Sequence, residues 1–295
     1  MDSPFHQGEQ SVQTRAGVRE RAEQMGRRMI RAFLPEQHRQ FFEQLPFVLV
    51  GSVDDEGAVW ASVLSGRPGF VYTPDEHTLR VRAAVGAELG ISAGRALGIL
   101  GIELPTRRRN RVNGRVTSAD AHGLTLAVDQ SFGNCPQYIT VRVPRAVPRE
   151  LGTVRGVGAR LPEELVAWIR ASDTAFIASA ASADPSGEAN EGVDVSHRGG
   201  EPGFVEVSER DGTTVLTIPD YAGNNAFNTL GNLQRYPHVG LSFPSFERGD
   251  WLALSGRAEL VWDADEVARY PHAKRLVRMT VEQGRVLPGG FPFAS

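Results

Sequence analysis

Residues 192–205 read GVDVSHRGGEPGFV, and their last four residues, Pro-Gly-Phe-Val at 202–205, occur a second time at 68–71. Each copy follows an aliphatic segment, 47–53 in the first half and 176–183 in the second. Two further landmarks recur in the same order, namely 98–105 and Asn113-Gly114-Arg115 in the first half, and 240–244 and Ser255-Gly256-Arg257 in the second. The agreement in order and character predicts a duplicated β module, although the spacings differ.

Composition and charge narrow the class of protein. The chain has 295 residues, of which 41% are hydrophobic and 23% charged, which is typical of a globular protein of two domains. A net charge of −3 gives no sign of nucleic-acid binding. The sequence has no apolar run of roughly 18 residues and no apolar signal-peptide core, so we expect no membrane association and a cytoplasmic location. A single cysteine, Cys135, excludes an internal disulfide and a cysteine-rich zinc cluster, and we expect no metal site.

The pattern of apolar residues and turns predicts three parts. Residues 1–45 form a helical N-terminal segment, with helical spacing from 11 and a restart at Pro35. Short Val-, Leu- and Phe-rich runs then predict a first antiparallel barrel over 46–150 and a second over 162–295. Strand character returns at 138–143, and a short helix is expected at 225–235. The fold class is therefore mainly β (α+β), with two small barrels after a helical lead-in.

A first candidate binding segment is IPDYAGNN at 218–225, which joins a predicted strand to a predicted helix. Free backbone N–H groups and the positive end of a helix suit an anion such as a phosphate. Further side-chain donors occur there at Asn224, Asn225, Asn228 and Thr229. The alternative is that these residues only cap the helix and form turns.

A second candidate is DVSHRGG at 194–200, at the end of a predicted strand. Arg198 could offer a bidentate guanidinium to a phosphate, and the glycines would let a ligand approach the backbone. The alternative is a polar strand end followed by a glycine turn. His197 has no partner at the spacing of a metal site or a catalytic triad.

Two segments of the first half remain open to more than one interpretation. The run TRRRNR at 106–111 either protects an exposed sheet edge or forms a positive rim for an acidic substrate or cofactor. The segment SFGNCPQY at 131–138 is unusually rich in rare residue types for a plain loop. Its Cys135 is either a buried filler or a redox-active thiol.

These residues resemble a known family. The stretches 192–205, 218–243 and 252–261 are similar to the FMN-binding split-barrel proteins of the pyridoxamine 5′-phosphate oxidase-like superfamily, especially to a bacterial subgroup with the pattern D-V-S-x-R-G-x-x-P-G-F-V. The segment SFGNCPQYI at 131–139 resembles one in its longer, two-barrel members. The resemblance implies tandem six-stranded Greek-key split barrels with FMN between them. One chain would then form an intrachain pseudo-dimer, and two chains could still pair as a homodimer.

The resemblance also implies site residues. The family's phosphate-binding strand falls on Ser196, His197 and Arg198, and its second phosphate element on the 224–229 loop, where neutral donors replace the usual Ser-Arg-Lys. The isoalloxazine would rest on the 216–219 strand, with the 131–138 segment as the far wall. The full expected set is Ser196, His197, Arg198, Ile218, Pro219, Asn224, Asn225, Asn228, Thr229, Asn134, Cys135 and Gln137.

The implied function is an FMN-dependent oxidoreductase acting on an unknown small molecule, in which the flavin carries the hydride and no side chain is assigned as acid or base. The tail at 288–295 lacks the Arg and His set of the true vitamin B6 oxidases, so pyridoxamine phosphate oxidation is not expected. One alternative is a haem-binding or haem-degrading barrel that uses His6, His122 or His197 as the iron ligand. A second is a deazaflavin-dependent reductase. A third is a non-catalytic flavin carrier or docking module for a redox partner, and a fourth is a barrel that has lost its cofactor.

Overall fold

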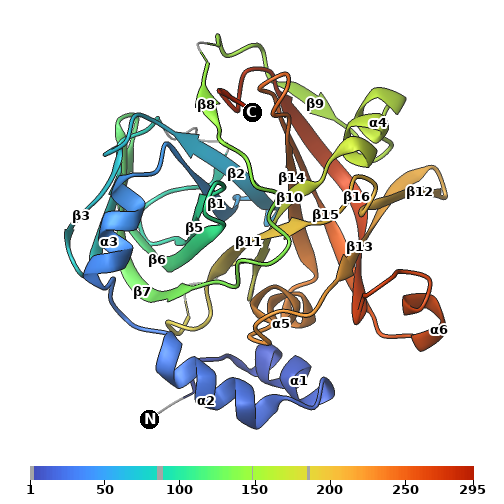
Figure 1. Ribbon diagram of the computed structural model, residues 1–295, viewed down its shortest axis with the longest axis horizontal. Coiled ribbons are helices and arrows are strands. Elements are labelled where there is room, and N and C mark those ends of the chain that lie inside the picture. The colour runs from blue at the N-terminus through green and yellow to red at the C-terminus, as the bar shows by residue number, and fades with distance from the viewer. Residues whose placement is uncertain (1–2, 85–88, 148, 185–186) are drawn as a thin grey trace.

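The computed structural model describes residues 3–84, 89–147, 149–184 and 187–295. Two antiparallel β-sheets lie side by side, and the N-terminal helices α1 and α2 lie below them, with α1 packed against α5 (Figure 1). The described helices are α1 (Gln7–Arg15), α2 (Arg19–Met29), α3 (Glu36–Glu43), α4 (Glu163–Ala171), α5 (Asn228–Arg235) and α6 (Ala264–Val267). The expected N-terminal helical segment is thus three separate helices, the first of which begins at Gln7 rather than at 11. The first two are separated by Gly17, whose positive φ of 70° ends α1.

The first sheet has the strand order β2-β1-β5-β6-β7-β4-β3. Its strands are β1 (Phe47–Val53), β2 (Val59–Ser65), β3 (Val71–Asp75), β4 (Thr78–Val81), β5 (Ala96–Glu103), β6 (Arg108–Asp120) and β7 (Gly123–Gly133). The chain then runs along the second sheet as far as β8 (Arg145–Ala146). The strand expected at 138–143 is absent from the structure; this part contains the left-handed residue Tyr138, which does not fit an extended ladder.

The second sheet has the order β11-β10-β14-β15-β16-β13-β12, and β9 (Arg155–Val157) pairs with β16. Its strands are β10 (Thr174–Ala180), β11 (Val193–Gly199), β12 (Glu206–Arg210), β13 (Thr213–Asp220), β14 (His238–Pro244), β15 (Trp251–Val261) and β16 (Arg275–Leu287). The short strand β17 (Phe293–Ala294) pairs with β8. Within the described residues, the edge strands of each sheet do not pair with one another, so both barrels remain open.

The two sheets are copies of one module. The strand order of the second sheet repeats that of the first, and each path contains seven strands rather than six. Both sheets carry a β-bulge at the same place, at Asn113/Gly114 and at Ser255/Gly256. The turn glycines Gly69 and Gly203 also share a positive φ, 90° and 88°, which a residue with a Cβ rarely adopts.

Three large hydrophobic clusters of the described residues hold the two sheets together. One fills the first sheet beneath α3, one fills the second sheet beneath α4 and α5, and the third lies between the two sheets. The third cluster combines aromatic residues of both halves, including Trp60, Phe176 and Trp251, with Phe291 of the C-terminal segment. The two halves therefore share a hydrophobic core and are not independently packed domains.

Glycines allow the two sheets to approach closely. In β5, a Cβ added to Gly98 would lie 2.3 Å from the carbonyl oxygen of Val193 in β11. In β14, a Cβ added to Gly240 would lie 2.7 Å from the carbonyl oxygen of Val59 in β2. The two contacts are equivalent under the duplication, because Gly98 pairs with Gly51 of β1 as Gly240 pairs with Ala178 of β10.

We expect Gly98→Ala to lower the free energy of unfolding by about 1–3 kcal/mol, the usual cost of forcing extra volume into a packed interior. The obstacle is backbone, which cannot rotate away as a side chain could. Urea unfolding followed by circular dichroism measures the effect. Gly156→Ala is the matched control, because an added Cβ there meets no described atom within 4 Å. Equal stability of the two variants would contradict the close approach of the sheets.

Candidate functional site

A narrow cleft of about 130 Å³ lies between the two sheets. The first sheet contributes the start of β6 and the segment that follows β7, and the second contributes β11, the end of β13 and the start of α5. Its polar lining includes Arg109, Arg111, Asn134, Ser196, Arg198, Asp220, Asn224, Asn225, Asn228 and Thr229. Both copies of the module are therefore needed to build it.

Two arginines of the run at 106–111, at alternate positions of β6, point into this cleft. Arg109 and Arg111 share one face of β6 and line the cleft. Arg108 points the other way, with its guanidinium 4.5 Å from the centroid of the Phe41 ring. The interpretation of this run as protection for a sheet edge is wrong, because β6 pairs with β5 on one side and with β7 on the other.

Arg111 forms a buried ion pair across the two halves. Its side chain is 2% exposed, and Nη1 donates to Oδ1 of Asp194 in β11 at 2.7 Å. The guanidinium also donates to the carbonyl of Val195 at 3.0 Å, to Oδ1 of Asn228 at 3.0 Å and to Oγ of Ser196. Asp194 is held in turn by Nδ2 of Asn113 at 2.8 Å. These contacts fix the guanidinium in one position at the back of the cleft.

Arg198 is placed by a second carboxylate. Its Nη1 donates to Oδ1 of Asp220 at the end of β13, and Oδ2 of the same carboxylate lies 3.1 Å from Nε of Arg275. Arg198 is only partly buried, with 20% of its side chain exposed. The cleft thus holds three arginines, Arg109, Arg111 and Arg198, while Asp220 is shared between two guanidinium groups.

The first turn of α5 forms one wall. Two residues in the loop before it, Asn225 and Phe227, are left-handed, with φ of 59° and 62°. Phe227 is the N-cap, and its side chain makes no capping hydrogen bond. The first-turn N–H groups of Asn228, Thr229 and Leu230 are not paired within the helix, and all three residues line the cleft. An uncapped helix start suits an anion, because its N–H groups and dipole are both favourable.

Several buried donors of the cleft have no partner among the described residues, namely Nε of Arg111, Nε of Arg198 and Nδ2 of Asn134. Burial is the main cause that lowers the pKa of Arg109, to about 10, with contributions from Arg111 and Arg198. Arg109 therefore remains charged at pH 7. The cleft offers positive charge and unused N–H donors, which are the requirements of a phosphate or carboxylate.

The mouth of the cleft carries two tyrosines. The rings of Tyr138 and Tyr221 lie 5.0 Å apart at 31° to one another, and Tyr138 is 44% exposed. Tyr138 belongs to the first half and Tyr221 to the second, so the pair bridges the halves. Cys135, half-buried, lies beside them in the lining.

The structure brings together all the expected site residues except one. Asn134, Cys135, Gln137, Ser196, His197, Arg198, Pro219, Asn224, Asn225, Asn228 and Thr229 line the cleft. Ile218 does not, because its side chain belongs to the core of the second sheet. Sequence reasoning did not assign Asp194, Asp220 or Tyr221, and it left Arg109 and Arg111 as one of two interpretations of a basic run. The two-residue spacing of Arg109 and Arg111 could have shown that both side chains lie on the same face of a strand.

His197 lies on the opposite face of β11 from Ser196 and Arg198. Its ring packs edge-on against Phe176 at 5.7 Å, and neither ring nitrogen has a partner among the described residues. Burial, followed by the charges of Arg109, Arg198 and Arg142, holds the pKa of His197 well below its usual value of 6.5. The imidazole is therefore neutral at pH 7.

Comparison with protein families finds one match. Residues 161–290, which contain all of the second sheet's main strands, match the family model described as pyridoxamine 5′-phosphate oxidase. Residues 161–290 are therefore similar to the pyridoxamine 5′-phosphate oxidase family. This second half supplies β11, the end of β13 and α5 to the cleft, while the first half, which repeats its strand order, supplies Arg109 and Arg111. A comparison with curated proteins finds no match.

Solved structures that resemble part of the chain have low identity to it. HupZ from Group A Streptococcus is 13% identical, with a TM-score of 0.31, covering 41% of this chain and 90% of its own. A conserved protein of unknown function from Corynebacterium diphtheriae is 12% identical, with a TM-score of 0.32, covering 46% and 98%. A putative 5-nitroimidazole antibiotic resistance protein from Bacteroides thetaiotaomicron is 11% identical, with a TM-score of 0.28, covering 48% and 95%.

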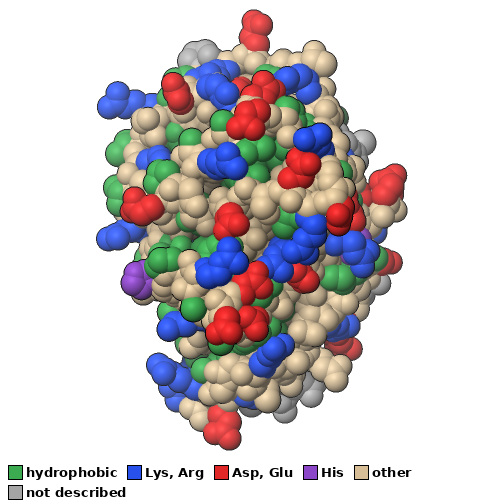
Figure 2. Space-filling model, turned by 90° about the vertical axis from the view of Figure 1, so that its right-hand side faces the viewer, with side chains coloured by type: hydrophobic (Ala, Val, Ile, Leu, Met, Phe, Trp, Pro, Cys, Tyr) green, Lys and Arg blue, Asp and Glu red, His purple; other side chains and the backbone are tan. Residues whose placement is uncertain are grey.

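Among the described residues, no helix combines the length and apolar character required to cross a bilayer. No cluster of three or more His, Cys, Asp or Glu side chains that could hold a metal ion occurs among them. On the face shown in Figure 2, basic and acidic side chains are interspersed.

We expect His197 to make the protein acid-labile. Below its ordinary pKa of 6.5 the unfolded chain binds a proton that the buried imidazole does not, so stability falls as pH falls. The contribution reaches at most about 1.4 kcal/mol per pH unit. His197→Leu should flatten the dependence of unfolding free energy on pH below the ordinary histidine pKa of 6.5, measured by urea titration at several pH values. The exposed His122→Leu serves as control, and equal slopes for both variants would contradict a buried neutral His197.

Proposed function

We propose that the cleft binds FMN through its phosphate, and that the protein is a flavin-dependent oxidoreductase acting on a small molecule not yet identified. The observation that carries the proposal is the convergence of three arginines with the uncapped start of α5. The match of residues 161–290 to the pyridoxamine 5′-phosphate oxidase family supports a flavin as the phosphate-bearing ligand.

The residues present fit the phosphate of FMN. The orphaned Nε groups of Arg111 and Arg198 are N–H donors to an anion, and the first-turn N–H groups of α5 add neutral donors. Thr229 has a hydroxyl within 3.4 Å of Oγ of Ser196, so these two side chains can close the same anion site. The neutral donors at 224–229 are thus supplemented by cations from β6 and β11.

When bound, FMN would supply hydride chemistry that no protein side chain provides. The chain's own residues bind and orient it. The enclosed volume of about 130 Å³ is smaller than the roughly 300–1,000 Å³ of typical cofactor pockets, so it suits the phosphate end rather than the whole molecule. We therefore assign Tyr138 and Tyr221, at the open mouth, to contact with the aromatic rings.

The phosphate assignment predicts a difference between two flavins. Arg198→Ala should weaken FMN binding about 10- to 100-fold, the loss of one charged hydrogen-bond donor worth roughly 1.5–3 kcal/mol. Riboflavin, which lacks the phosphate, should bind wild type and variant equally. Quenching of flavin fluorescence on titration measures both affinities.

Arg210→Ala is the matched control for this substitution, because Arg210 is exposed at the end of β12. Its affinity for FMN should equal that of wild type. If Arg198→Ala weakens FMN and riboflavin alike, the arginine supports the cleft without contacting a phosphate, and the assignment is wrong.

The duplication does not provide a second cleft of the same kind. By strand register, the positions equivalent to Arg109 and Arg111 are Trp251 and Ala253. The position equivalent to Arg198 is Leu64. Trp251 is buried against Phe291, with ring centroids 5.8 Å apart. Apolar packing thus replaces the cationic donors.

We consequently expect each chain to bind one FMN, not two. Isothermal titration calorimetry on protein of known concentration gives the stoichiometry directly. A value near two per chain would mean that the apolar side also accepts a flavin, and that the arginines do not define the site.

The absorption spectrum of the purified protein discriminates among cofactors. Flavin bands, with FMN released on heating, support the proposal, whereas a Soret band would favour haem. A colourless protein that takes up no added FMN would overturn it. Consumption of NADH or NADPH by the flavin-loaded protein separates an oxidoreductase from a flavin carrier.

A further inference from the structure

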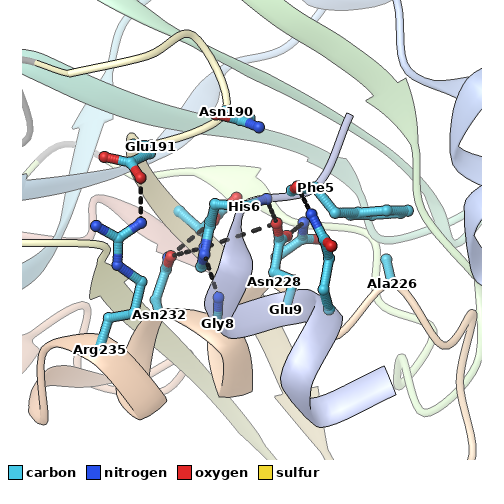
Figure 3. A network of polar contacts seen from close by, with 12 residues as sticks. Phe5, His6, Gly8, Glu9, Asn190, Glu191, Ala226, Asn228, Asn232 and Arg235 are labelled. Carbon is cyan, nitrogen blue, oxygen red and sulfur yellow. Dashed lines mark hydrogen bonds and ion pairs between the residues drawn. The ribbon is translucent and has the colours of Figure 1, made fainter. Parts of the chain in front are cut away.

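The N-terminal helix α1 lies against α5 at very short range (Figures 1 and 3). A Cβ added to Gly231 of α5 would lie 2.6 Å from Cα of Glu9, and one added to Gly8 would lie 2.2 Å from the carbonyl oxygen of Gly231. Two glycines thus let the helix backbones meet. Glu9 of α1 and its N-cap residue His6 therefore contact side chains of α5 directly.

Two polar connections run from α1 through α5 to the sheets. In the first, Nδ2 of Asn228 donates to Oε1 of Glu9 (Figure 3). Oδ1 of the same Asn228 accepts from Nη1 of Arg111 at 3.0 Å. In the second, Oδ1 of Asn232 lies 2.8 Å from Nε2 of His6, and its Nδ2 donates to Oδ2 of Asp194 at 2.9 Å. Asn228 and Asn232 are one helical turn apart, so both point the same way.

Glu9 is fixed on its other side as well. Its Oε2 accepts the backbone N–H of His6 at 2.9 Å, which forms a capping box at the start of α1. The residue is 3% exposed, and it lies outside the lining of the cleft. Its two oxygens therefore join the N-terminus to Asn228, which does line the cleft.

We propose that Glu9 is a positioning residue for the cleft: it fixes the side-chain amide of Asn228, and through it the guanidinium of Arg111, for binding a phosphate-bearing ligand. This inference rests on the proposed function of the cleft. A free Asn228 amide could rotate and present Nδ2 to Arg111, two donors facing each other. With Nδ2 held by Glu9, the oxygen must face the arginine, and Nε of Arg111 is left free for the ligand.

The charge of Glu9 is coupled to the same ligand. Burial, and then the charge of Asp194, raise the pKa of Glu9 well above its usual range, while Arg111 and the bonds from His6 and Asn228 oppose the shift. The other charged groups facing this network are Glu191 and Arg235, which pair with each other, and His6, whose pKa is lowered by burial. An ionised Glu9 disfavours an anion nearby, so affinity should fall as pH rises through the pKa of Glu9.

The test compares three full-length proteins, namely wild type, Glu9→Ala and Glu9→Gln, with Glu20→Gln as the control. Glu20 is an exposed glutamate of α2, so the control removes the same charge outside the network. FMN, riboflavin and inorganic pyrophosphate are titrated by fluorescence or calorimetry between pH 5 and 9, and thermal unfolding is recorded for each protein. We expect Glu9→Ala to lose about tenfold in FMN and pyrophosphate affinity while riboflavin affinity is unchanged.

Glu9→Gln keeps an acceptor for Asn228 without a charge. In wild type, ionisation of Glu9 should make FMN affinity decrease as pH rises. In Glu9→Gln this decrease should be absent, whereas Glu20→Gln should have the same pH profile as wild type. This variant keeps the test decisive if Glu9→Ala does not fold. Wild-type affinities and pH profiles in both Glu9 variants would overturn the positioning role while leaving the cleft's function intact. Failure of wild type to bind FMN or pyrophosphate would overturn the cleft's function and this inference together.

Discussion

The ion pair between Arg111 and Asp194 is the contact on which the cleft depends. It joins the two halves of the chain in a place that water barely reaches, with side-chain exposures of 2% and 8%. A buried pair of this kind adds little net stability compared with apolar packing, but removal of one partner typically costs about 3–5 kcal/mol. Its role here is geometric: with Asp194 also held by Asn113 and Asn232, the two sheets have one register at this point.

The rest of the site follows from that fixed point. Asn228 can bond Arg111 only because α5 starts directly after a loop with two left-handed residues, and that start is left uncapped. The N-terminal helix then closes the network from outside, because Gly8 and Gly231 permit contact between the helix backbones. Segments separated by more than 200 residues in sequence are thus joined by side-chain hydrogen bonds, such as that between Asn228 and Glu9.

Much of this architecture was predictable from local patterns. The repeated Pro-Gly-Phe-Val turn and the glycine of each bulge reflect local backbone requirements, and they identified the duplication correctly. The cleft residues of the second half could be predicted because they lie at the end of a predicted strand and at the start of a predicted helix. The roles of Asp194 and Asp220 could not be predicted, because a buried carboxylate is recognised only by the arginine that faces it. For Asp194 that arginine is Arg111, which belongs to the other half. Glu9 was unpredictable for the same reason, since its contacts depend on how α1 packs against α5.

The duplication explains why the chain can have one polar cleft and one apolar seam. In a dimer of identical subunits, any residue that improves one interface position is imposed on the other. Fusion of two copies removes that constraint, because each copy can then change separately. On the cleft side Arg111 faces Asp194. On the other side Ala253 and Trp60 occupy the equivalent positions. Burying two charges requires hydrogen-bonding partners around them, which the cleft side has in Asn113, Asn228 and Asn232. The apolar side needs none, and its cluster of Trp60, Trp251 and Phe291 is free to stabilise the pairing of the halves while the other side is specialised for a ligand.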